Sequence, residues 1–370
     1  MIYLDNGATS FHKPTEVKQA VLKAMEQCAN PGRGGYPAAI EAARVLFNCR
    51  ETAGLFFGCN PEQVVLTYNC THGLNIAIRS LVKPGDKVVV SGFEHNAVVR
   101  PLYALNAQLT VVGRKLFDWQ DTLEQWELAL KKGPKAAVFT HVSNVFGYIL
   151  PVEEMGKLCR QYGVPFILDA AQSAGSIPID LKSLGADFIA MPGHKGLLGP
   201  QGTGLLLCAR DPEPLLYGGT GGNSLSHEMP LELPDRAEAG TANVPAVAGL
   251  TAGLRYLQRM GVENVGRKEK VQADHCAHVL EKLGFQVFTG DHRSGTLSFL
   301  PKTDCEEAAN LFAQQGIALR AGLHCAPLAH ESAGTLHTGT LRLSFGHDAT
   351  LKQSQGFLQT AKRLKQRREI

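Results

Sequence analysis

The sequence predicts an α/β protein built on a mostly parallel, doubly wound sheet. From residue 63 onward, short runs rich in β-branched residues alternate with segments of helical periodicity. Several of these runs are apolar throughout, as strands buried on both faces of a parallel sheet are. Ligands of such sheets bind beside the carboxyl ends of the strands, so the polar residues that follow each run are the first candidates for a functional site.

The elements can be assigned in order along the chain. Pro14 is expected at the first position of a helix, because apolar residues recur at helical spacing from Val17 to Cys28. A loop over 30–36 separates it from a second long helix, expected over 38–57. The strands of the sheet are then expected at 64–67, 87–91, 109–112, 136–141, 165–169 and 187–191.

The alternation weakens from about residue 250, which indicates a second, smaller unit of the α+β type. Helices are expected over 246–259, 265–283 and 306–315, with strands over 295–300 and 317–320. We therefore expect a large domain at 13–250 and a small C-terminal domain formed by 1–12 and 251–370. The N-terminal strand is expected to return to the small domain.

Composition excludes several classes of function. The 370 residues include 37 basic and 34 acidic ones, a net charge of +3 that gives no footprint for nucleic acid or membrane. No apolar stretch is long enough to span a bilayer and the start does not resemble a signal peptide, so a cytoplasmic protein is expected. The nine cysteines include no Cys-x-x-Cys pair, which favours reduced thiols, and no metal site is assigned.

Two residues at strand ends carry the main chemical signal. Lys195 stands alone between His194 and Gly196 after an apolar run, which indicates a Schiff-base lysine, although a solvated loop lysine is the alternative. Asp169 directly follows another apolar run, and a buried carboxylate is costly unless a cation faces it. A protonated pyridine nitrogen would be such a cation. The pair therefore predicts a pyridoxal-type cofactor, with Asp169 for the ring and Lys195 for the aldehyde.

Further candidates follow other strands. The segment around Cys70 and Thr71 opens a helix and is either a phosphate site or, with Thr71 as N-cap, an ordinary helix start. His95 follows the 87–91 strand, and Asn144 follows the 136–141 strand. Cys325 differs from the other cysteines because two potential cations in its loop, Arg320 and His324, could lower its pKa. The other eight are expected to be buried or idle thiols.

The motifs together resemble the class V aminotransferase family of pyridoxal-phosphate enzymes, and within it the cysteine desulfurase and selenocysteine lyase branch of group II type. The similarity extends from Tyr3 to the strand that contains Arg342. It rests on five ordered motifs: Glu94-His95-Asn96, Ser143-Asn144-Val-Phe-Gly147, Asp169-Ala-Ala-Gln172, Gly193-His194-Lys195 and Arg320-Ala-Gly-Leu-His324-Cys325-Ala-Pro. The resemblance implies fold type I, with a large cofactor-binding domain and a small C-terminal domain.

The resemblance also implies roles for single residues. The residues implied to hold the cofactor are Lys195 at the aldehyde, Asp169 at the pyridine nitrogen, Gln172 at the ring oxygen, His95 on the ring face, and Thr71, His194 and the backbone around Cys70 at the phosphate. Asn144 and Arg342 would bind the substrate carboxylate, with Arg320 as the alternative arginine. Gly240-Thr241 would reach the phosphate in the neighbouring subunit of a homodimer.

The implied reaction converts cysteine to alanine and leaves a persulfide on Cys325 for a sulfur-acceptor protein, with selenocysteine as a related substrate. Catalytic roles fall to Lys195, Cys325 and, for proton movement, His95. Ordinary transamination or another β-elimination, in which Cys325 would be dispensable, is one alternative. A non-catalytic, cofactor-binding persulfide carrier is another. Many relatives have a serine at the position of Pro192 and a threonine at the position of Cys70. Binding of the phosphate could therefore differ in this chain.

Overall fold

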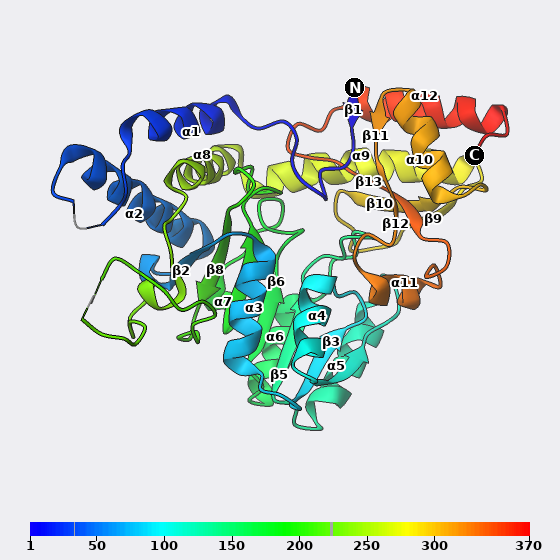
Figure 1. Cartoon of the computed structure of the whole chain (residues 1–370). Helices are drawn as coiled ribbons and strands as arrows, with labels where there is room; N and C mark the ends of the chain where they lie inside the picture. The colour runs from blue at the N-terminus through cyan, green and yellow to red at the C-terminus, as the bar shows by residue number, and fades with distance from the viewer. Residues whose placement is uncertain (33, 223–224) are drawn as a thin grey trace.

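The larger sheet confirms the predicted α/β fold. The computed structural model describes residues 1–32, 34–222 and 225–370. Within them, seven strands form one sheet in the order β2-β8-β7-β6-β5-β3-β4 (Figure 1). The central pairings are parallel, and β8 runs antiparallel to both β2 and β7. The strands are β2 Val64–Thr67, β3 Lys87–Ser91, β4 Gln108–Val112, β5 Ala136–Thr140, β6 Phe166–Asp169, β7 Phe188–Pro192 and β8 Gly204–Cys208.

Helices cover both faces of this sheet. Buried residues of α2, α5, α6 and α8 pack on one face, and those of α3 and α4 pack on the other. The helices are α1 Thr15–Gln27, α2 Pro37–Phe57, α3 Cys70–Leu81, α4 Asn96–Ala104, α5 Trp119–Leu130, α6 Val152–Gln161, α7 Leu181–Leu184 and α8 Val244–Met260. Pro14 precedes α1 rather than occupying its first position. In the part of the chain that the structure describes, none of the helices combines the length and apolar character needed to cross a membrane.

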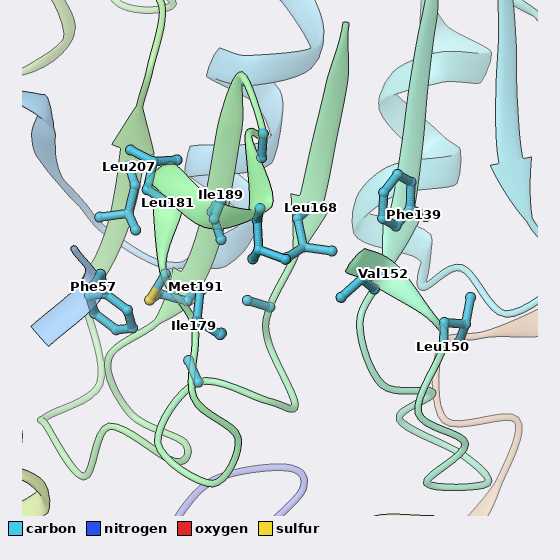
Figure 2. Close-up of a cluster of buried hydrophobic side chains, with 14 of the residues drawn as sticks. Phe57, Phe139, Leu150, Val152, Leu168, Ile179, Leu181, Ile189, Met191 and Leu207 are labelled. Atoms are coloured by element: carbon cyan, nitrogen blue, oxygen red, sulfur yellow. The ribbon is translucent and has the colours of Figure 1, made fainter. Parts of the chain in front are cut away.

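The strand register aligns apolar side chains into rows. Phe139 pairs with Leu168, Leu168 with Ile189, and Ile189 with Leu207, so one row crosses four strands. Figure 2 shows these side chains packed with Phe57 of α2. Because successive strand residues point to opposite faces, the intervening residues fill the second core under α3 and α4. Burial on both faces fixes the register, and the register fixes which residues stand at the strand ends.

A smaller sheet lies in the C-terminal part of the chain. Among the described residues it has the antiparallel order β12-β13-β10-β9, and β1 pairs in parallel with β11 (Figure 1). These strands are β1 Ile2–Tyr3, β9 Gln286–Phe288, β10 Thr296–Leu300, β11 Ile317–Ala318, β12 Arg320–Gly322 and β13 Thr340–Ser344. The helices beside them are α9 Val262–Lys282, α10 Cys305–Gln314, α11 Pro327–Ala333 and α12 Leu351–Gln366.

Two details differ from the expectation for this part of the chain. The single strand expected over 317–320 is two strands, because β11 pairs with β1 while β12 pairs with β13. Residue 250, the expected domain boundary, lies inside α8, and α8 is separated from α9 only by Gly261 with φ of 77°. The division into 13–250 against 1–12 and 251–370 stays a prediction.

Candidate active site

A cavity at the carboxyl edge of the large sheet brings together most of the residues singled out in the sequence. His95 caps α4 four residues after β3, Asp169 ends β6, and Lys195 stands three residues after β7. Since these strands are parallel, their ends meet at one edge. The predicted residues that line the cavity are Cys70, Thr71, His95, Asn144, Asp169, Gln172, Pro192, His194 and Lys195.

Asp169 and Lys195 both line this cavity, and the charge of each affects the pKa of the other. The Asp169 side chain is buried, and its Oδ1 accepts hydrogen bonds from the Ala171 N–H at 2.9 Å and the Cys70 thiol at 3.5 Å. Burial raises the pKa of Asp169, although the Ala171 N–H and the charge of Lys195 oppose the shift. Burial likewise lowers the pKa of Lys195, although the charges of Cys70 and Asp169 oppose the shift. A larger share of Lys195 is therefore the neutral amine.

His95 is held as a neutral imidazole with a defined tautomer. Its Nδ1 accepts the Ala97 N–H at 3.0 Å, so the ring proton of the neutral form sits on Nε2. Burial, followed by the charge of Lys195, lowers the pKa of His95 to about 4. His194 is similar, because burial lowers its pKa to about 4 and its Nδ1 lies 3.0 Å from Thr9 Oγ1.

The start of α3 offers an anion site to the cavity. The N-cap is Asn69, whose side chain accepts the His72 N–H at 2.9 Å, so the alternative that Thr71 serves as N-cap is wrong. Thr71 is exposed and lines the cavity. Among the described residues, the backbone N–H groups of Cys70 and Thr71 have no hydrogen-bond partner. Free N–H groups and the positive end of the helix dipole suit a phosphate.

The two arginines of the small sheet meet at Asp5, a residue to which the sequence analysis gave no role. Arg342 on β13 donates from Nη2 to Asp5 Oδ1 at 2.7 Å. Arg320, opposite it on β12, donates from Nε to Asp5 Oδ2 at 3.0 Å, and its Nη2 forms an ion pair with the same oxygen at 2.9 Å. Arg342 is 3% exposed, whereas the Arg320 side chain is 51% exposed. An acid that directly follows an apolar N-terminal strand was the signal that could have identified Asp5.

Hydrogen bonds connect this arginine pair to the cavity. Arg342 Nη1 donates to the backbone oxygen of Asn144 at 2.9 Å, and Asn144 Nδ2 donates to the backbone oxygen of His324 at 2.7 Å. Gln172 Nε2 donates to the backbone oxygen of Gly7 at 2.9 Å. The N-terminal segment and the Cys325 loop are therefore both tied to residues of the cavity.

Cys325 is exposed, while seven of the other cysteines are buried, as expected for them, and Cys28 is half-buried. His324 and Cys325 both have positive φ, at 49° and 57°, and the Cys325 backbone oxygen accepts the Asn96 N–H at 2.8 Å. The expectation that His324 provides a cation is wrong. Burial and the charge of Arg342 lower its pKa to about 2, so His324 is neutral.

Thr241 lies apart from the Lys195 cavity. With Gly240 it lines a separate small cavity beside Tyr68 and His72. Within the described residues of one chain, the predicted phosphate contact of Thr241 is therefore not formed at the Lys195 site.

The residues of the Lys195 cavity fit pyridoxal phosphate. The buried carboxyl of Asp169 suits a protonated pyridine nitrogen, and the free N–H groups of α3 suit a phosphate. Lys195 provides an amine for the aldehyde, and neutral His95 provides a planar ring on the same cavity wall. Pro192 and Cys70 also line the cavity and offer the phosphate no hydroxyl.

The chain is similar in sequence and in structure to known proteins. The family model described as aminotransferase class-V matches residues 2–357. A probable cysteine desulfurase of Methanothermobacter thermautotrophicus is 31% identical, over 96% of this chain and 92% of its own. The apo structure of the Thermococcus onnurineus NA1 cysteine desulfurase has a TM-score of 0.91 at 31% identity, covering 98% and 94%. The cysteine desulfurase CsdA of Escherichia coli has a TM-score of 0.84 at 26% identity, covering 99% and 94%.

Proposed function

Since the chain belongs to the class V aminotransferase family, whose members depend on pyridoxal phosphate, we propose that it is a cysteine desulfurase that converts L-cysteine to L-alanine. The observation that carries the proposal is the convergence of Lys195, Asp169 and His95 on one cavity, beside an exposed cysteine on a loop tied to that cavity. Relatives of about the same length carry the same activity in their names.

The cofactor, when bound, supplies an aldehyde carbon and a ring that accepts negative charge. Asp169 would hold the ring nitrogen, Lys195 would hold the aldehyde, and Gln172 would hydrogen-bond the ring oxygen. The N–H groups at the start of α3, with Thr71 and His194, would hold the phosphate. His95 would lie on the ring face. Each of these residues lines the same cavity.

Lys195 is suited to act as the base that takes the α-proton of the substrate. Burial lowers the pKa of its amine, and the nearby positive charges of Arg342 and Arg320 lower it further. A base with a lowered pKa is free of its own proton more often at neutral pH. Arg342 and Asn144 would orient the substrate through its carboxylate, and Arg320, which pairs opposite Arg342 on β12, would be the alternative arginine.

Cys325 is suited to accept the sulfur. Its thiolate attacks the substrate sulfur, an S–S bond forms, and the substrate C–S bond breaks with its electron pair left on carbon. A proton then completes the alanine methyl group, so cysteine and one thiol give alanine and one persulfide. Exposure of Cys325 leaves the persulfide open to a sulfur-acceptor protein. Selenocysteine would follow the same route, with selenium in place of the substrate sulfur.

A homodimer is part of the proposal. Large apolar side chains are exposed on α1 and α2, which lie at the edge of the molecule remote from the small sheet (Figure 1): Leu22, Met25, Ile40, Phe47 and Leu55. Such a surface is typical of a protein interface. The separation of Thr241 from the Lys195 cavity fits a contact made to the neighbouring subunit instead.

The proposal is tested by incubating the purified, cofactor-loaded protein with L-cysteine and a reducing thiol. Alanine and sulfide should appear in equal amounts, and Cys325→Ala should abolish both. A keto acid as the product would favour transamination or another elimination. A loaded protein that turns over no cysteine would favour a non-catalytic carrier.

A further inference from the structure

Asp5 is an acid that lies between Arg342 and Arg320, the two arginines proposed to bind the substrate carboxylate. Each of its carboxylate oxygens holds a different arginine, Oδ1 holding Arg342 and Oδ2 holding Arg320. Within the described chain, Asp5 is the acid paired with either arginine. Two positive charges and one negative charge leave this cluster with a net charge of +1.

The position of Asp5 is fixed by its backbone rather than by the arginines. The Asn6 N–H and Nδ2 both donate to the backbone oxygen of Ser344, at 3.3 and 3.1 Å, and the Gly7 N–H donates to Ser344 Oγ at 2.7 Å. The Tyr3 hydroxyl shares its one hydrogen between the backbone oxygens of Asp5 and Thr9, at 3.1 and 3.0 Å. The carboxylate is therefore a built-in part of the cluster, and its removal leaves these anchors in place.

Arg342 is directed toward a ligand as well as toward Asp5. Its side chain is 3% exposed, and its Nε is a buried donor with no partner among the described residues. A buried guanidinium donor without a partner is costly and indicates a missing acceptor. The charge of Arg342 lowers the pKa of both Lys195 and His95, which places the cluster within electrostatic range of the Lys195 cavity.

We propose that Asp5 is a specificity-determining residue, which sets the arginine cluster to a charge that matches amino acids with one carboxylate and disfavours those with two. The inference rests on the proposed function, because it assigns the substrate class of the same site. A cluster of charge +1 is neutralised by one carboxylate, so a second carboxylate finds no further positive charge in the cluster to balance it. Like-charge juxtaposition and unpaired buried charges are the usual means of rejecting a wrong ligand.

The test uses two nearly isosteric ligands, L-asparagine and L-aspartate, that differ by one negative charge. Their dissociation constants are measured on the cofactor-loaded protein from the change in cofactor absorbance, and independently from the shift in melting temperature. The readout is the ratio of the two constants, which requires no desulfuration. Asp5→Asn should shift this ratio about tenfold toward aspartate, the effect expected for one unit charge in partly screened surroundings.

Three variants separate charge from structure. Asp5→Glu should keep the wild-type ratio, because it keeps the charge. Asp5→Asn combined with Arg320→Gln should restore the ratio, since the net charge returns to +1, and no merely structural role of Asp5 would be rescued by removing an arginine. Glu16→Gln, which removes an exposed acid paired with Arg259, is the control for loss of one negative charge elsewhere and should change nothing.

An unchanged ratio in a folded Asp5→Asn protein would overturn the inference, as would failure of the double variant to restore it. If Asp5→Asn does not fold, Arg320→Gln alone should shift the ratio about tenfold against aspartate, because it lowers the charge of the cluster by one unit. No shift in that variant would also overturn it. Failure of the proposed function is visible separately, as a protein that binds no cofactor or forms no alanine from cysteine.

Discussion

His141 provides a test of the electrostatics at the edge of the sheet. It directly follows β5, and its backbone N–H donates to the backbone oxygen of Asp169 at 2.9 Å. His141 is 5% exposed, and its Nδ1 has no partner among the described residues. Burial lowers the pKa of His141 from 6.5 to about 4. As the pH falls below 6.5, the unfolded chain binds this proton before the folded chain does, so stability is lost down to about pH 4.

The size of this loss of stability follows from the pKa of His141 in the unfolded chain, 6.5, and in the folded chain, about 4. Each pKa unit is worth about 1.4 kcal/mol, and pH 5.5 lies roughly one unit below the unfolded pKa of 6.5. His141 should therefore contribute about 1.4 kcal/mol to the loss of stability between pH 8 and pH 5.5. His141→Asn should reduce the pH dependence of the free energy of unfolding by that amount, whatever its effect at pH 8.

Urea unfolding at the two pH values measures the difference. Ser143→Ala is the matched control, because Ser143 lies in the same turn, where its Oγ accepts the Val145 and Phe146 N–H groups. This variant should lose stability equally at both pH values. If His141→Asn keeps the full pH dependence of the wild type, the argument that burial holds His141 neutral is refuted.

Other predictions concern the residues of the cavity and the Cys325 loop. Borohydride should fix the cofactor covalently to the wild-type chain but not to Lys195→Ala, as read by mass spectrometry. Asp169→Asn should retain much of the cofactor but lose activity by ~100-fold or more, because an amide cannot hold the ring proton. Arg342→Lys should raise the KM for cysteine more than Arg320→Lys does, because Arg342 is the buried arginine bonded to Asn144; the reverse order in steady-state kinetics would exchange their roles. Cys325→Ala should lose sulfide release yet retain appreciable selenide release from selenocysteine, since the selenol leaves with less help; equal losses would contradict this.

The large sheet and the centre of the site could be predicted because their signals are local. Apolar strands buried on both faces are visible as runs of residues, and parallel strands bring their carboxyl ends to one edge. Asp169 ends one such run and Lys195 stands three residues after another, so their meeting in one cavity follows from the topology. The lone lysine and the acid after an apolar strand were sufficient signals.

The remaining features depend on contacts between distant segments. The pairing of Asp5 with two arginines joins residues more than 300 positions apart, and periodicity carries no record of it. The neutral state of His324 results from its burial, which its place beside an exposed cysteine did not indicate. The split of the expected 317–320 strand depends on β1 taking one half and β13 the other.

The most direct test of the account is the fate of the substrate sulfur. The cofactor-loaded protein is mixed with L-cysteine in the absence of reducing thiol, quenched, and digested for mass spectrometry of the peptide that contains Cys325. One added sulfur atom is expected on Cys325, formed together with one alanine per active site and absent from the other eight cysteines. Alanine formed without sulfur on Cys325, or sulfur bound first at another cysteine, would contradict it.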